Sequence, residues 1–133
     1  MVKKYLIDTN TCIFYMKGRF NLIEKFNNVG FGNCYISEIT LAELKFGVQN
    51  SQNIAKNTAA LEAFLTNIKI LPIIPSLDFY ALEKTRLRKL GTPISDFDLL
   101  IGATSVTNSM VMVSNNTREF SRIHNINLED WTI

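Results

Sequence analysis

Histidine and cysteine are scarce in this chain. His124 is the only histidine, and the two cysteines, Cys12 and Cys34, are too far apart in the sequence to form a zinc-binding pair. The composition therefore disfavours a zinc site and a disulfide framework. We expect both cysteines to be small, buried apolar side chains.

No hydrophobic run is long enough for a signal peptide or a membrane-spanning helix, so we expect a cytoplasmic protein. A large excess of either charge is also lacking. The net charge is +2 and the pI about 8.6, which permits a nucleic-acid partner without arguing strongly for one. Hydrophobic residues make up 47% and charged residues 20% of the chain, as in globular proteins. No repeat, linker or low-complexity tract is present, so we predict a single domain over residues 1–133.

Short apolar runs alternate with helical patterns along the chain. The runs predict strands at 5–7, 34–36, 70–74, 110–114 and 126–128. The apolar spacing predicts helices at 11–16, 21–26, 39–46, 51–67, 76–90 and 95–108, a loop at 27–32, and a loop or short helix at 115–122. This alternation predicts an α/β fold with a parallel sheet.

Polar side chains follow the predicted strands or open the helices. Asp8 ends the first strand, and Glu43 lies in the first turns of the helix after the second strand. The other members of this set are Asp96, Asp98, Ser114, Asn115 and Asn116. Helices that connect parallel strands begin near the carboxyl ends of those strands, so we expect all these groups at one edge of the sheet.

Carboxylates crowded at one edge repel each other unless a cation neutralises them. Oxygen ligands without histidine or cysteine suit Mg²⁺, with Mn²⁺ as a substitute. Such an ion can orient an attacking water and stabilise charge on a phosphoryl oxygen. The pattern therefore indicates hydrolysis of a phosphodiester.

Each acid also has a structural interpretation. Asp8 could cap the next helix, and the pairs Thr40–Glu43 and Ser95–Asp98 both fit capping boxes. Asparagines such as Asn115 and Asn116 are common in loops. Independent caps need not face one crevice, however, so the shared edge favours function.

Five motifs resemble those of PIN-domain ribonucleases, and more closely the VapC-type toxins of bacterial toxin–antitoxin pairs. They are LIDTN (6–10), ISEITLAELKFG (36–47), GTPISDFDLLIGA (91–103), SNNTREF (114–120) and LEDW (128–131). They occur in the family's order and span almost the whole chain. The resemblance implies a three-layer α/β/α sandwich with a mainly parallel sheet, Mg²⁺-dependent RNA cleavage, homodimers, and inhibition by a cognate antitoxin.

The same resemblance implies roles for single residues. It makes Asp8, Glu43 and Asp98 metal ligands, and places Asn116 at a catalytic position where many relatives carry aspartate. Thr9, Asn10, Thr40 and Ser114 would orient the acids and waters. Helix geometry turns Asp96 away from Asp98, so we expect Asp96 to support the site or to face RNA.

The basic residues are less informative. Arg118 and Arg122 flank Asn116 and could contact RNA phosphates. A solvated helix face explains the other basic group better; its members are Lys84, Arg86, Arg88 and Lys89.

We therefore interpret the chain as the ribonuclease toxin of a toxin–antitoxin module. One alternative is a catalytically silent PIN-like module that binds RNA or a protein, and Asn116 is the feature that favours it. Another is a receiver-like phosphoacceptor domain, although no lysine directly follows the last clear strand. The segments 11–16 and 21–26 carry enough apolar side chains to line an antitoxin groove as well as to pack on the core; these are Ile13, Phe14, Tyr15, Phe20, Leu22, Ile23 and Phe26.

Overall fold

The computed structural model describes residues 2–133 and is built on a sheet of five parallel strands. The strands are β1 (Tyr5–Ile7), β2 (Cys34–Ser37), β3 (Lys69–Leu71), β4 (Val111–Val113) and β5 (Asn127–Glu129). They pair in the order β3-β2-β1-β4-β5, so β1 lies at the centre. Leu6 of β1 is opposite Tyr35 of β2 on one side and Met112 of β4 on the other. The predicted parallel sheet is confirmed.

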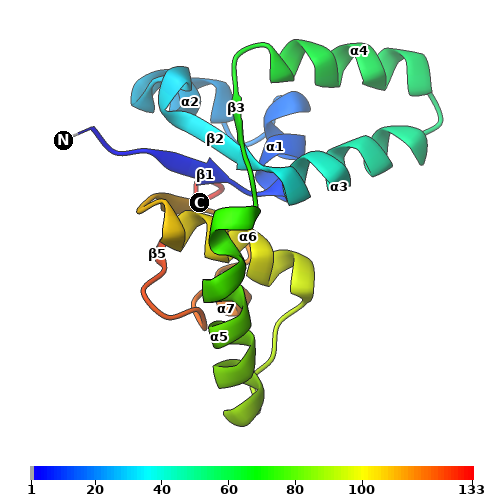
Figure 1. The fold of residues 1–133 in the computed structure, drawn as a ribbon. Helices are drawn as coiled ribbons and strands as arrows, with labels where there is room; N and C mark the ends of the chain where they lie inside the picture. Colours follow the sequence, from blue (N-terminus) through cyan, green and yellow to red (C-terminus); the bar gives the residue numbers. More distant parts are fainter. Residues whose placement is uncertain (1) are drawn as a thin grey trace.

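Seven α-helices cover the two faces of this sheet (Figure 1). The helices α1 (Thr9–Met16), α2 (Leu22–Val29), α3 (Glu38–Gln49) and α4 (Ile54–Leu65) contribute to one core cluster. The helices α5 (Leu77–Lys89), α6 (Asp96–Thr107) and α7 (Thr117–Phe120) contribute to the other. Two short 3₁₀ helices, η1 (Phe31–Asn33) and η2 (Ile74–Ser76), complete the chain. The α/β/α sandwich implied by the family resemblance is therefore present.

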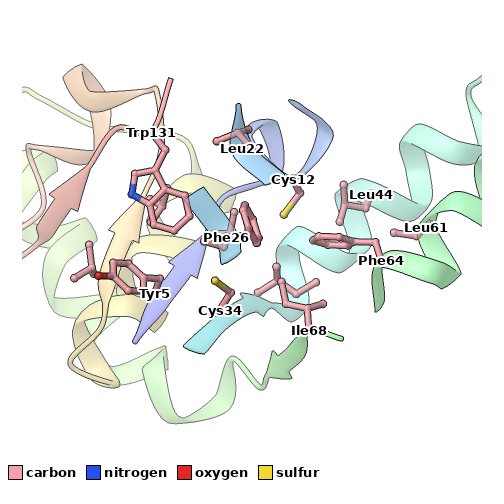
Figure 2. Packing of buried hydrophobic residues seen from close by; sticks show 14 residues of the cluster. Tyr5, Cys12, Leu22, Phe26, Cys34, Leu44, Leu61, Phe64, Ile68 and Trp131 are labelled. Carbon is pink, nitrogen blue, oxygen red and sulfur yellow. The ribbon is translucent and has the colours of Figure 1, made fainter. Parts of the chain in front are cut away.

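Alternation along the strands divides the core into two clusters. Tyr5 and Ile7 of β1 point to the side of α1–α4, whereas Leu6 between them points to the side of α5–α7. In the first cluster, which Figure 2 shows with Phe26 beside Trp131, the ring centroids of this pair are 5.5 Å apart. Tyr15 packs against the same Phe26, with 4.4 Å between ring centroids. Because both faces of β1 are covered, its three residues are all buried.

The cysteines behave as the composition predicts. Cys12 and Cys34 are buried free thiols in the first cluster. Burial raises the pKa of the Cys34 thiol to about 12, so that thiol stays protonated and unreactive. No helix within residues 2–133 is long and apolar enough to cross a membrane.

Several predicted boundaries were wrong. The helix expected at 11–16 begins at Thr9 because Asp8 caps it, and α2 continues through Val29 into the expected loop. The strand expected at 70–74 covers only Lys69–Leu71, since Pro72 follows and the chain turns into η2. The helix expected at 39–46 also extends past Gly47, which α3 accommodates, to Gln49.

Candidate active site

The order in which the chain adds strands to the sheet reverses between β1 and β4, and a cleft lies at that point. From β1 the chain proceeds to β2 and β3 on one side and returns to β4 on the other. Ligand sites in open α/β sheets lie beyond the carboxyl ends of strands at such a switch point. Asp8 follows β1 and Ser114 follows β4, so these side chains flank the crevice.

Asp8 is held from both sides of the switch point. Its side chain is only 5% exposed. Oδ1 accepts a hydrogen bond from the backbone N–H of Thr11 at 3.1 Å, which makes Asp8 the N-cap of α1. Oδ2 accepts from the Ser114 hydroxyl at 2.5 Å, and that hydroxyl in turn accepts from the N–H of Asn116 at 2.9 Å. Asp8 is therefore an N-cap, as one interpretation predicted, but it has a second role. Its Oδ2 links the end of β1 to Ser114 at the end of β4.

Glu43 reaches the cleft from α3. The Thr9 hydroxyl donates to Glu43 Oε1 at 2.6 Å and lies 3.3 Å from the buried hydroxyl of Thr40. The capping box predicted for Thr40 and Glu43 was wrong, because α3 begins earlier and Ser37 is its N-cap, accepting from the Thr40 N–H at 3.1 Å. Glu43 therefore lies beyond the first turn of α3 and is not needed to cap the start of that helix.

Asp98 comes from the first turn of α6. Its backbone N–H donates to the Ser95 hydroxyl at 3.2 Å, so Ser95 is the predicted N-cap. Oδ2 of its carboxylate lies 3.5 Å from Nδ2 of Asn116. That distance is at the limit of a hydrogen bond, so the Asp98 carboxylate keeps most of its capacity for another partner.

These side chains line one cleft of about 150 Å³. Its walls are Asp8, Thr9, Asn10, Glu43, Asp98, Ile101 and Asn116. The volume corresponds to about five water molecules at roughly 30 Å³ each. An ion with part of its water shell and the oxygens of one phosphate fit such a space, whereas a whole nucleotide does not.

Electrostatics make the cleft unfavourable for several free negative charges. Burial raises the pKa of Asp8, and the charge of Asp98 adds to that rise although the Ser114 hydrogen bond opposes it. Burial also raises the pKa of Asp98, although a hydrogen bond from Ser95 opposes this rise, and the charge of Glu119 adds a smaller contribution to it. A cation bound here would lower the pKa of both carboxyl groups, because it stabilises their charged forms.

The donor set fits a hard divalent ion that keeps several waters. Asp8, Glu43 and Asp98 offer only oxygens, which Mg²⁺ prefers. Within residues 2–133, no group of three acidic, histidine or cysteine side chains is positioned to hold a metal ion by itself. Mg²⁺ does not require three protein ligands, since it is usually held by one or two carboxylates plus water and phosphate oxygens.

Other predicted residues lie elsewhere. Asp96 faces α5, where its Oδ1 is 2.8 Å from Lys84 Nζ and accepts from the Tyr80 hydroxyl at 2.8 Å. It therefore does not line the cleft, as the helical geometry predicted. Arg118 is exposed on α7 and also lies outside the cleft lining.

The prediction that Arg122 is available for RNA is weakened by its contacts. Its Nη1 donates to the Pro93 carbonyl at 3.0 Å and lies 3.3 Å from Glu119 Oε2. Arg86 is not simply solvated either, because it pairs with Glu83, which is only 4% exposed. Lys84 pairs with Asp96, so the expected solvated face is limited to Arg88 and Lys89.

Glu119 was missed by the sequence analysis. It belongs to α7 and is close enough to Asp98 for its charge to raise the pKa of that acid. Its position one helical turn after Asn116 was the available signal. The apolar wall formed by Ile101 was also missed, because a buried isoleucine in a helix normally indicates only core packing.

Known proteins match the chain over almost its entire length. The family model described as PIN domain matches residues 5–126. The tRNA(fMet)-specific endonuclease VapC of Salmonella typhimurium is 34% identical over 96% of this chain and 98% of its own length. Ribonuclease VapC2 of Haemophilus influenzae is 35% identical over 96% of this chain and 98% of its own.

Solved structures agree with this match. The DNA-bound VapBC of Salmonella typhimurium has a TM-score of 0.90 at 34% identity, covering 97% of this chain and 98% of that one. VapBC2 of Rickettsia felis, bound to a DNA fragment from its promoter, has a TM-score of 0.84 at 31% identity, covering 96% and 98%. The chain therefore belongs to the PIN-domain family and, within it, to the VapC ribonucleases.

Proposed function

We propose that this protein is a metal-dependent endoribonuclease that hydrolyses RNA phosphodiester bonds as the toxin of a toxin–antitoxin module. The observation that carries the proposal is the meeting of Asp8, Glu43 and Asp98 in one small cleft at the switch point of the sheet. PIN-domain VapC nucleases are metal-dependent in general. For this chain we propose Mg²⁺, with Mn²⁺ as a substitute, because every candidate ligand in the cleft is an oxygen.

The proposed ligands are Asp8, Glu43 and Asp98. A bound Mg²⁺ would supply Lewis-acid stabilisation of the phosphoryl oxygens and lower the pKa of a bound water. The chain's own polar groups hold the ligands in place: Ser114 fixes one oxygen of Asp8, and Thr9 fixes one oxygen of Glu43. Such hydrogen bonds orient ligands and raise their affinity for the ion.

Asn116 takes a polar role that needs no charge. Its amide lies beside Asp98, and its backbone N–H completes the contact to Ser114. An amide at this position can hydrogen-bond a water or a phosphate oxygen, although it contributes no negative charge to an ion. We therefore propose one strongly bound ion.

The partner we propose is a cognate antitoxin that binds on α1 and α2. Leu22 and Phe26 are buried, whereas Phe20 is 48% exposed and Ile23 is 55% exposed. Phe20 also packs edge-on against Phe14 at 5.0 Å between centroids. The apolar side chains of this region are thus only partly used by the core, and an antitoxin segment would cover the rest. The neighbours found as VapBC complexes support such a partner.

Mutation of the exposed pair tests this partner surface. Phe20→Ser with Ile23→Ser should abolish co-purification of the cognate antitoxin while RNA cleavage persists. Leu82→Ser is the matched control, because Leu82 is 74% exposed on α5, against the opposite face of the sheet. Equal losses in both variants would contradict the placement on α1 and α2. We also propose a homodimer acting in the cytoplasm, which light scattering and cell fractionation would test.

Incubation with RNA tests the main proposal. The purified chain should cleave total RNA, with a tRNA pool as a second substrate, in Mg²⁺ and not in EDTA. Asp98→Asn should remove the activity without changing the circular dichroism spectrum. RNA binding without cleavage by pure, Mg²⁺-loaded protein would instead support the catalytically silent alternative.

A further inference from the structure

A second cavity lies on the other side of α6 from the active cleft. It measures about 500 Å³ and opens between the end of α5 and the start of α6. Asp96 lines this interhelix cavity, whereas Asp98, two positions later, lines the active cleft. The first turn of α6 therefore separates the two sites.

The interhelix cavity combines apolar walls with a charged rim. Leu87, Ile94 and Leu99 supply apolar lining, and Leu87 and Leu99 are each 1% exposed. Lys84, Arg88 and Asp96 supply the charges, and both the Lys84 and Tyr80 contacts use Oδ1 of Asp96. Within residues 2–133, both side-chain hydrogen bonds of Asp96 use Oδ1, so Oδ2 keeps its capacity to accept another hydrogen bond.

We propose that the interhelix cavity binds one nucleotide of the single-stranded RNA that enters the active cleft. The base lies against Leu87, Ile94 and Leu99, with the Arg88 guanidinium on its face or its phosphate. Oδ2 of Asp96 accepts an N–H, which every nucleobase carries. This inference rests on the proposed ribonuclease function and deepens it by adding a base-holding site.

Size supports this assignment. A cavity of about 500 Å³ is within the roughly 300–1,000 Å³ typical of small-molecule sites. The active cleft of about 150 Å³ has space for the scissile phosphate but not for an adjoining base. A base next to the cleaved bond must therefore lie elsewhere, and the interhelix cavity is separated from the cleft by a single helical turn.

Charge supports an RNA strand in particular. The last turn of α5 carries Arg86, Arg88 and Lys89, and Lys84 precedes them on the same helix. Glu83 neutralises Arg86, and Asp96 neutralises Lys84. Arg88 and Lys89 are exposed, so a positive charge remains beside the cavity for a phosphate backbone.

The two exposed cations give a matched pair of variants. Arg88 lines the cavity and Lys89 does not, although they are neighbours in one turn and each removes one charge when replaced. Binding is measured by fluorescence anisotropy of a labelled ten-nucleotide adenosine RNA in EDTA, which prevents cleavage. The second probe is the same RNA with abasic riboses, which keeps every phosphate but has no bases.

The base-holding site predicts a specific pattern. The unchanged protein should bind the adenosine RNA about tenfold more tightly than the abasic RNA. Arg88→Ala should weaken binding of the adenosine RNA by about tenfold and of the abasic RNA by only about twofold. Lys89→Ala should weaken both by about twofold, as expected for loss of one phosphate contact.

Three results would overturn the inference. The unchanged protein could bind both RNAs equally, or Arg88→Ala and Lys89→Ala could weaken both RNAs by the same factor. Arg88→Ala could also change the molar mass by light scattering, which would make this face an interface between two copies of the chain. Cleavage in Mg²⁺ is recorded in parallel: differential binding without cleavage would reject the proposed function alone, and cleavage without differential binding would reject the base-holding site alone.

Discussion

Replacement of Asp8 by asparagine should separate stability from activity. Asparagine has the same shape as the protonated carboxyl group and is an equally good N-cap, so the bond from the Thr11 N–H survives. The new amide lies opposite Ser114, whose hydroxyl oxygen can accept from it as well as from the Asn116 N–H. Asp8→Asn therefore changes charge and little else.

The direction of the Asp8 pKa gives the sign of the stability effect. Burial raises that pKa above its ordinary value of 3.8, so the folded protein tolerates the neutral form better than the carboxylate. The charge of Asp98 acts in the same direction. Asp8→Asn removes this cost and loses one charge-assisted hydrogen bond, and we expect a net gain of about 1 kcal/mol, the usual size for replacement of a strained functional group.

The gain should depend on pH and on the metal. The cost of the buried carboxylate is present at neutral pH. It shrinks as the pH falls through the raised pKa of the folded protein and disappears only below the ordinary pKa of 3.8, where Asp8 binds a proton in both states. The stabilisation by Asp8→Asn should vanish with it. In Mg²⁺ the unchanged protein should become more stable than the variant. A free Mg²⁺ concentration of 100 times the Kd adds about 2.7 kcal/mol to the free energy of unfolding of the protein that binds the ion.

Thermal unfolding of both proteins measures this pattern. In EDTA at pH 7.5 we expect Asp8→Asn to raise Tm by about 3–5 °C, and this difference should disappear only at pH values below 3.8. In Mg²⁺ the unchanged protein should have the higher Tm, and RNA cleavage by the variant should be lost. An equal Mg²⁺ shift in the two proteins would show that Asp8 is a helix cap and not a ligand.

Four further substitutions follow from the contacts. Asp98→Asn should abolish cleavage and Mg²⁺ binding while Asp96→Asn keeps most of kcat, and metal titration with kinetics would refute this if the order were reversed. Ser114→Ala should lower Mg²⁺ affinity or activity by about 10- to 100-fold, because one oxygen of the metal ligand loses its donor. Glu83→Gln should destabilise the fold by about 2 kcal/mol at pH 7 in urea unfolding, since the bond from Arg86 lowers the Glu83 pKa. That difference should shrink as the pH falls below 4.5 through the lowered pKa, and a constant difference would contradict it.

The local sequence pattern was sufficient to predict most helices and strands and the edge of the sheet where Asp8, Glu43 and Asp98 meet. The run Tyr5–Ile7 followed by Asp8 marks a buried strand and its end without any tertiary information. Residues two apart on a helix point in very different directions, and Asp96 and Asp98 do line different cavities. Their roles in metal and RNA binding stay predictions.

Competing local signals limited the rest. Ser37 and Thr40 are both good N-caps, and only the pairing of β2 with β1 and β3, which extends the strand to Ser37, decides between them. Arg122 pairs with Glu119, three residues earlier, and this spacing was available in the sequence. Its second partner, the Pro93 carbonyl, lies 29 residues away, and such a long-range contact depends on how the segments pack. The sequence analysis therefore left Arg122 free for RNA.

The location of the cleft follows from strand order more than from any single side chain. After β1 the chain enters α1 on one face of the sheet, and after β4 it enters α7 on the other. Because neighbouring strands send their connections to opposite faces, no helix covers the gap between their ends, and Asp8 and Ser114 bridge it directly. Each of these strands has only three residues, so the pairing register of β1 with β4, in which Leu6 is opposite Met112, is what aligns Asp8 with Ser114. A slip of one residue would move Asp8 by about 3.3 Å and turn it to the other face, which would separate it from Ser114 and from Asp98 together.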